Sequence, residues 1–578
     1  MGWVEWGVCI YIALSLADVV ATRPFDWIES LGSNSRRWRG FPYRLRRFYD
    51  RTVHWIIISV IIFIALDGVE RMSDIDSNGI LSGWVLDLPL ALGCAAVAAG
   101  MLGNIWAQAQ VSRLGSSRVA AGVIILASSV ILILGVLLLV YILGKSLNQI
   151  HGSTPIFWGA SALAVLVLLG WLPDVNYVSM HRYYRDRLME LFMPDLQQVR
   201  RSISRRGDDS NVGASLPADA TMLGDVCRLN GDGDEGRPTR GPYHLINANV
   251  VLVASKHPRF RGRGGDNFLL SPLYCGSRAT GWVETDRRPG PGLTLATAMA
   301  ISGAAFNPNA GPSGEGFARQ PVLSVLLGML NLRLGYWHDN PSLNAHPLLS
   351  RFLRPNLIWP GLLESFGRLI LNENKRHVLL TDGGHFENLG LYELVRRRLK
   401  LIVVCDGTAD PKYQFGDLAN AIEKIRADFG VIIEGLSSDD LATLVPGPDD
   451  GAVGSAAQRG YLIARIRYSR RPGHDSDEGV LVLLKSTVFP GLSADLVGYR
   501  RQFPDFPNQS TSDQFFDERQ FEAYRELGFQ TAMALLSHLA IHPEALMDRD
   551  HLRTTAAALL KGAGCEPIDS SRPTSPTN

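Results

Sequence analysis

The chain has 578 residues, and its 57 lysines and arginines nearly balance 56 aspartates and glutamates, for a formal net charge of +1. This balance excludes a strongly basic chain, so we expect no nucleic-acid partner. Six cysteines without a CxxC pair argue against a disulfide framework or a zinc site, and we expect no metal and no organic cofactor.

The first 175 residues are the most apolar part of the chain. Val119–Gly144 contains no charged side chain, and at about 1.5 Å per residue a helix of this length would cross a hydrocarbon core of roughly 30 Å. The sequence therefore predicts a bundle of four or five transmembrane helices in residues 1–175. The other candidates are 53–69, 84–106, 156–172 and, as the weakest, 3–21.

The loops between these segments predict an orientation. The loop 23–51 is rich in arginine, the next loop contains several acidic residues, and basic and non-basic loops then alternate. Because basic loops stay on the cytoplasmic side, we expect an integral, multi-pass membrane protein with its C-terminal domain in the cytoplasm. Four spans would place Met1 inside, and five would place it outside.

Residues 176–240 are predicted to connect the membrane part to a folded domain. The segment 177–198 has the pattern of an amphipathic helix, and a polar, glycine-rich linker follows over about 200–240. Asn230, Asp232 and Asp234 alternate as at the start of a calcium loop, but Glu235 stands where such a loop needs glycine. We therefore interpret this stretch as a flexible linker.

Residues 241–545 alternate between apolar strands and helical segments, which predicts an α/β domain whose sheet is covered on both faces. The tail 546–578 is expected to be disordered. The predicted strands are 247–254, 267–273, 377–380, 401–405, 461–468 and 480–484, and the predicted helices are 294–303, 321–334, 389–399 and 514–539.

The segment 377–398 carries the main candidate for chemistry. Its short strand ends at Asp382, and Gly383 and Gly384 then turn the chain towards a helix that begins near Asn388. Ligands bind at the carboxyl ends of strands in open α/β sheets, and glycines permit φ > 0 and a close approach of the backbone. Asp382 therefore either projects into a pocket or caps backbone N–H groups, and these residues alone leave both alternatives open.

Strand, Asp-Gly-Gly and helix in this order resemble the motif of patatin-like phospholipases, relatives of cytosolic phospholipase A2. PYHLINANVVLVAS (242–255) and LTLATAMAISGAAFNPNAG (293–311) are similar to segments of this family, and LNLRLGYWHDNP (330–341) is similar to a large subfamily with a membrane segment inside the catalytic region. The resemblance implies a three-layer α/β domain, here its C-terminal half, in which Asp382 is the base of a Ser-Asp dyad and Gly383 and Gly384 shape the turn.

The nucleophile that this resemblance implies is missing. Such enzymes need a G-x-S-x-G elbow and backbone oxyanion donors, and the sequence contains no G-x-S-x-G. In the subfamily the elbow would precede Met1, so a separate or missing N-terminal half would supply the serine. Within this chain, Ser302 and Ser271 are the alternative candidates.

The sequence thus predicts a membrane-anchored lipid acyl hydrolase of the phospholipase A type that acts on membrane phospholipids. The alternative is a catalytically inactive membrane scaffold or lipid-binding protein.

Overall fold

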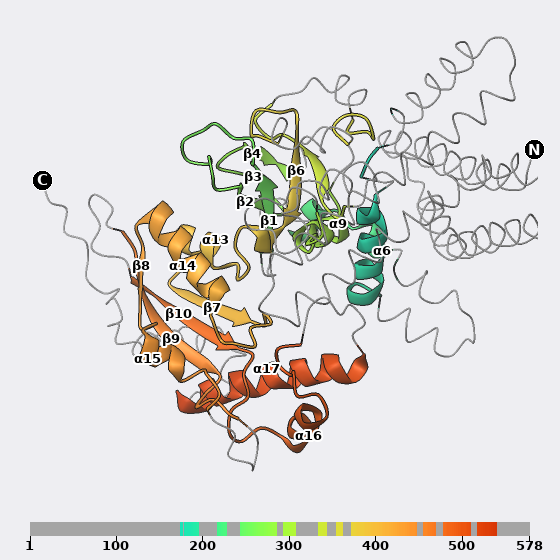
Figure 1. Cartoon of the computed structure of the whole chain (residues 1–578). Coiled ribbons are helices and arrows are strands. Elements are labelled where there is room, and N and C mark those ends of the chain that lie inside the picture. Colours follow the sequence, from blue (N-terminus) through green and yellow to red (C-terminus); the bar gives the residue numbers. More distant parts are fainter. Residues whose placement is uncertain are drawn as a thin grey trace, which may run out of the picture. The chain divides into compact units, whose positions relative to one another are not determined.

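The computed structural model describes the residues from 171 to 539, with gaps (Figure 1). These residues form two compact units, Met1–Phe386 and Glu387–Asn578, and each is described by itself. The described ranges are 171, 174–176, 179–195, 215, 217–227, 243–285, 293–307, 333–343, 354–361, 371–447, 455–469, 478–509 and 517–539.

The N-terminal unit contains a six-stranded sheet in the order β4-β3-β2-β1-β6-β5, in which all neighbouring strands are antiparallel. Short connections favour this arrangement for β2, β3 and β4, because antiparallel neighbours can be joined by tight turns whereas parallel ones need a crossover. The strands are β1 Ile246–Val251, β2 Gly265–Leu270, β3 Tyr274–Ser277, β4 Gly281–Glu284, β5 Tyr336–Asp339 and β6 His377–Asp382.

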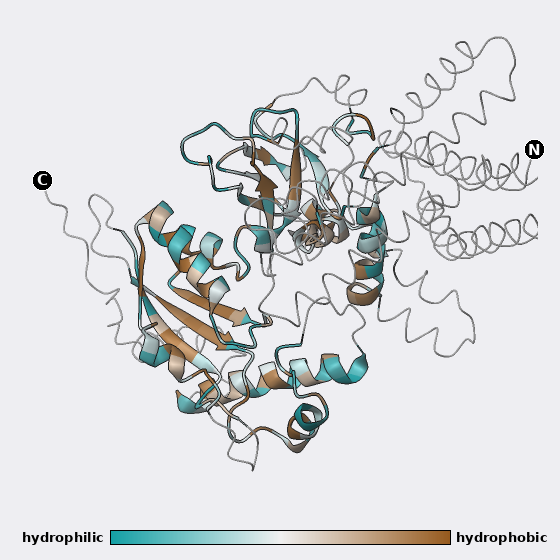
Figure 2. Cartoon of the chain, viewed as in Figure 1, coloured by the Kyte–Doolittle hydropathy of each residue, from teal (hydrophilic) through white to brown (hydrophobic). Residues whose placement is uncertain are grey.

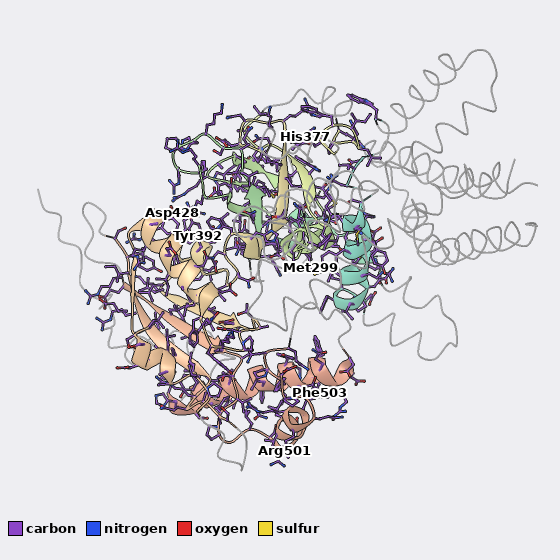
Figure 3. The ribbon with its side chains drawn as sticks, in the orientation of Figure 1. Met299, His377, Tyr392, Asp428, Arg501 and Phe503 are labelled. Carbon is purple, nitrogen blue, oxygen red and sulfur yellow. The ribbon has the colours of Figure 1, made fainter. Side chains whose placement is uncertain are left out.

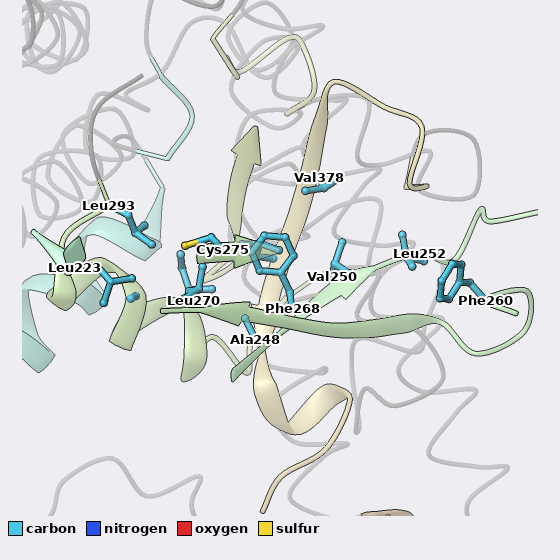
Figure 4. Packing of buried hydrophobic residues seen from close by; sticks show 13 residues of the cluster. Leu223, Ala248, Val250, Leu252, Phe260, Phe268, Leu270, Cys275, Leu293 and Val378 are labelled. Carbon is cyan, nitrogen blue, oxygen red and sulfur yellow. The ribbon is translucent and has the colours of Figure 1, made fainter. Parts of the chain in front are cut away.

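One face of this sheet packs on helix α9 (Leu295–Ser302), which contributes Ala298 and Ile301 to the core. Figure 4 shows Phe268 of β2 in the middle of this cluster, with Val250 of β1 beside it. Helix α6 (Met180–Phe192) packs against α9 in turn. On the other face of the sheet, Leu379 belongs to a separate cluster with Val251 and Trp337. The central strands are therefore buried on both sides.

The C-terminal unit contains a four-stranded sheet in the order β7-β10-β9-β8, where β7 and β10 are parallel and the other pairs antiparallel. Its long helix α17 contributes Leu535 to a core with Val480 and Val482 of β10. Tyr392 and Asp428, labelled in Figure 3, join two further helices through a 2.5 Å hydrogen bond. The elements are β7 Leu401–Asp406, β8 Ile432–Glu434, β9 Tyr461–Arg467, β10 Glu478–Lys485, α13 Leu391–Arg396, α14 Gly416–Phe429, α15 Ser438–Ala442, α16 Ala494–Gln502 and α17 Glu518–His538.

The predicted fold class is corrected with respect to the membrane. Within the part of the chain that the structure describes, no helix combines the length and the apolar character needed to cross a membrane. The longest of these helices, α17, has 21 residues but carries Glu518, Arg519 and Glu522 in its first turns, and Figure 2 shows hydrophilic and hydrophobic residues mixed along it. This finding contradicts the predicted bundle of four or five transmembrane helices and the multi-pass membrane localisation. Apart from Trp171, the predicted spans lie outside the described residues.

The predicted three-layer α/β domain with one sheet is also corrected, because the described strands form two sheets and one of them contains antiparallel pairs alone. Nearly every predicted strand and helix from 247 to 539 is confirmed to within a few residues of its ends, and 177–198 contains α6. The part of the linker with Asn230, Asp232 and Asp234, most of the predicted helix 321–334 and the tail 546–578 lie outside the described residues. Residues 217–227 of the predicted linker are described, and they contain the 3-10 helix Leu223–Cys227, whose Leu223 is buried in the core.

We predict that Phe268→Ala destabilises the N-terminal unit by about 3 to 5 kcal/mol, because it removes a fully buried ring and leaves a cavity. Urea unfolding followed by circular dichroism measures the loss. Phe529→Ala on α17, where the ring is 54% exposed, is the control and should change the unfolding free energy little. Equal effects of the two substitutions would contradict this description of the core.

Candidate functional site

Asp382 ends a strand that is otherwise buried. The first five residues of β6, His377 to Thr381, are buried, and only Asp382 is partly exposed. The strand lies between β1 and β5, and Asp382 is paired in register with Ala248 of β1. An apolar strand in the middle of a sheet thus carries a carboxyl group to the rim of the core, where it loses much of its contact with water.

The carboxyl group of Asp382 is fixed by the turn that follows it. Its Oδ1 accepts a hydrogen bond of 2.6 Å from the backbone N–H of Gly384, so Asp382 caps the short helix η5, Gly383–His385. Its own N–H donates to the carbonyl of Ala304, just after α9, at 3.2 Å. Among the described residues, Oδ2 has no hydrogen-bond partner. Asp382 can therefore both cap the backbone and bind a ligand, because Oδ1 accepts the Gly384 N–H while Oδ2 stays available for another hydrogen bond.

Burial raises the pKa of Asp382 to about 6, although the hydrogen bond from Gly384 opposes this change. The physical cause is that removal from water disfavours the charged form of a carboxyl group. A carboxyl group with a pKa near neutrality can exchange protons at physiological pH, as a general base must.

Gly383, the first of the two glycines in the turn, packs closely against strand β1. A Cβ atom on Gly383 would lie 2.9 Å from the carbonyl oxygen of Asn247 in β1, which is closer than real side chains allow. Neither Gly383 nor Gly384 has a positive φ. The chain enters a 3-10 turn here, whose angles are open to any residue.

A second polar group, made by Thr381, His385 and Asn249, lies next to Asp382. The Thr381 hydroxyl accepts a hydrogen bond of 3.1 Å from Asn249 Nδ2 and is 3.0 Å from His385 Nδ1. Burial lowers the pKa of His385 to about 4, so its ring is neutral at pH 7. No hydrogen bond joins this ring to the Asp382 carboxylate in the described part of the chain. His385 thus holds the turn together.

The two candidate serines lie in different places. Ser302 is the last residue of α9, two residues before the Ala304 carbonyl that binds Asp382. Ser271 follows β2 and is fully engaged in a turn, where its hydroxyl donates to the Tyr274 carbonyl at 2.6 Å and lies 2.9 Å from the Tyr243 hydroxyl. The fold therefore brings Ser302, and not Ser271, to the segment that contacts Asp382.

Asp406, the carboxylate that ends the next strand, is engaged elsewhere. It belongs to the C-terminal unit, where it forms a buried ion pair of 3.0 Å with Lys485 of the neighbouring strand β10. Its second oxygen accepts from the Thr408 hydroxyl at 2.6 Å. With both oxygens bonded, Asp406 stabilises the end of the β7–β10 pair.

No protein-family model, no curated protein and no solved structure matches this chain.

We predict that Gly383→Ala destabilises the N-terminal unit by about 1 to 3 kcal/mol, because the added methyl group must displace the Asn247 backbone. Thermal unfolding measures the loss. The control is Gly528→Ala within α17, where an added Cβ meets nothing within 4 Å and should stabilise the helix by up to about 1 kcal/mol. A neutral Gly383→Ala variant would contradict the close packing of the turn.

We also predict that Asp382→Asn stabilises the protein in a pH-dependent way. The pKa is raised from 3.8 in the unfolded chain to about 6 in the folded one, so folding penalises the charged carboxylate. The penalty is absent below pH 4, grows as the pH rises to 6, and is constant above that. The variant should match the wild type at pH 4 and exceed it by on the order of 2 to 3 kcal/mol at pH 7. A difference that does not change with pH would contradict the raised pKa.

Proposed function

We propose that Asp382 is the general base of a site that hydrolyses acyl esters, with glycerophospholipids or related acyl esters as substrates. The observation that carries this proposal is the state of one carboxyl group. Its Oδ1 is held by Gly384, its Oδ2 has no partner among the described residues, and its pKa is about 6. A base must be fixed, accessible and mostly unprotonated at its working pH, and this group meets all three conditions.

The chemistry that suits such a base begins with a hydroxyl nucleophile. Oδ2 takes the hydroxyl proton while the hydroxyl oxygen attacks the ester carbonyl carbon, and the resulting tetrahedral oxyanion collapses with cleavage of the ester C–O bond. Asp382 then returns its proton to the departing alcohol, which leaves an acyl group on the nucleophile. Water, deprotonated by the same carboxylate, cleaves this acyl bond and restores the hydroxyl.

Ser302 is the nucleophile candidate that fits this site best within the described residues, because it precedes the Ala304 contact to Asp382. The alternative is that a serine from a separate N-terminal half completes the dyad. The resemblance to patatin-like phospholipases supports the reaction class. A scaffold or lipid-binding protein without activity would keep the same turn but would not need a base with an available oxygen.

The proposal predicts that the purified chain reacts with a fluorophosphonate probe and that Asp382→Asn slows this labelling at least about a hundredfold, the usual scale of a general-base effect. Gel fluorescence measures the rate, and mass spectrometry of the labelled peptide identifies the nucleophile. Asp439→Asn, which changes an exposed carboxylate of the C-terminal unit, should label at the wild-type rate. The labelling of Ser302→Ala and of Ser271→Ala shows which of the two serines, if either, is the nucleophile.

Labelling that Asp382→Asn leaves unchanged would remove Asp382 from the mechanism. If the intact chain is not labelled at all, the proposal fails for this chain, and the inactive scaffold becomes the better account.

A further inference from the structure

Tyr184 of α6 lies against the segment that contacts Asp382. Its hydroxyl oxygen is 2.7 Å from the place where a Cβ atom of Gly303 would stand. Gly303 ends α9, and the next residue, Ala304, accepts the N–H of Asp382. The phenol thus lies against Gly303, next to the residue that accepts the backbone N–H of Asp382, and the missing side chain of Gly303 makes room for the phenol.

The electrostatics place the two groups close together as well. Burial and, second, the negative charge of Asp382 raise the pKa of Tyr184 above its ordinary value of 10. The phenol therefore keeps its proton at neutral pH and is a hydrogen-bond donor, while the carboxylate is an acceptor. Neither Tyr184 Oη nor Asp382 Oδ2 has a hydrogen-bond partner among the described residues.

The elements packed around this pair contribute few groups that titrate near pH 6. Helix α9 and strand β1 contain no ionisable side chain. Burial lowers the pKa values of His181 and His385 to about 4, below the range in which Asp382 titrates. The remaining charged groups on α6 and β2 are Arg182, Arg185, Asp186, Arg187, Glu190 and Asp266, and Arg185 is held in ion pairs with Asp186 and Asp219.

We propose that Tyr184 is the second ligand-binding group of the Asp382 site, and that the ligand of the pair is an alcohol hydroxyl. This hydroxyl donates its hydrogen to Asp382 Oδ2 and accepts one from Tyr184 Oη. A donor and an acceptor that both lack hydrogen-bond partners among the described residues suit one oxygen atom that carries one hydrogen.

The inference rests on the proposed function in one respect, since the bound hydroxyl would be that of the nucleophile. Tyr184 would then hold the hydroxyl oxygen in place while Asp382 removes its proton. The pairing of phenol and carboxylate, in contrast, can be tested without any enzymatic activity.

The test is carbon-13 NMR of the full chain labelled at the ζ-carbon of its 16 tyrosines, recorded from pH 4 to pH 8. The resonance that disappears in Tyr184→Phe belongs to Tyr184. We expect it to shift with a midpoint near the pKa of Asp382, about 6, and to lose this step in Asp382→Asn. Tyr183→Phe, which changes the neighbouring tyrosine with a 52% exposed ring, should leave the step intact.

Gly303→Ala tests the geometry, because its Cβ would push the phenol away and should abolish the step. Gly498→Ala, with nothing within 4 Å of the added atom, is its control. A Tyr184 resonance without a step near pH 6, or a step that survives Asp382→Asn, would overturn the inference.

Fluorophosphonate labelling separates this inference from the proposed function. If the chain is labelled, Tyr184→Phe should slow the reaction by about tenfold, the effect of one lost hydrogen bond, while Tyr183→Phe should not. If the Tyr184 resonance shifts near pH 6 but the chain is not labelled, the pairing of Tyr184 with Asp382 is retained and the proposed hydrolase activity is rejected. Labelling that Tyr184→Phe leaves unchanged would reject the role of Tyr184 in binding the hydroxyl.

Discussion

The partial burial of one carboxyl group, that of Asp382, is the constraint on which the rest of the site depends. Water stabilises a charged carboxylate, and an apolar strand in the centre of a sheet removes that stabilisation. The burial of Asp382 follows from its place at the end of β6, because five buried residues precede it and because strands flank β6 on both sides. The Gly384 N–H restores part of the lost solvation to one oxygen. The result is a carboxyl group whose proton affinity lies near neutrality.

Backbone contacts, and not flexible side chains, hold this group in place. Gly383 packs on the Asn247 carbonyl, and Ala304 accepts the Asp382 N–H, so β1 and the end of α9 fix both sides of the turn. Such contacts leave the carboxylate little freedom, which favours a site that is formed before its ligand binds. This buried carboxylate lowers the free energy of unfolding above pH 6, where an uncharged side chain at position 382 would make the folded protein more stable.

The sequence predicted the position of Asp382 well because a short apolar run followed by Asp-Gly-Gly is a local pattern. It did not predict β3, β4 and β5, whose four residues each are too few to show a period. The prediction of one sheet covered on both faces failed because hairpin turns, such as the one at Ser271, decide how strands pair. Tyr184 was missed because its contact with Gly303 joins residues far apart in sequence. α6 also buries Arg185 and Asp186, which pair in the core, where its pattern suggested apolar residues.

The central claim is that Asp382 exchanges its proton near pH 6 in the folded protein. The most direct measurement is carbon-13 NMR of the chain labelled at the aspartate carboxyl carbons, with the resonance of Asp382 assigned from its absence in Asp382→Asn. The account predicts a titration midpoint near 6 for this resonance. A midpoint near the ordinary value of 3.8 would show a solvated carboxylate and contradict the account.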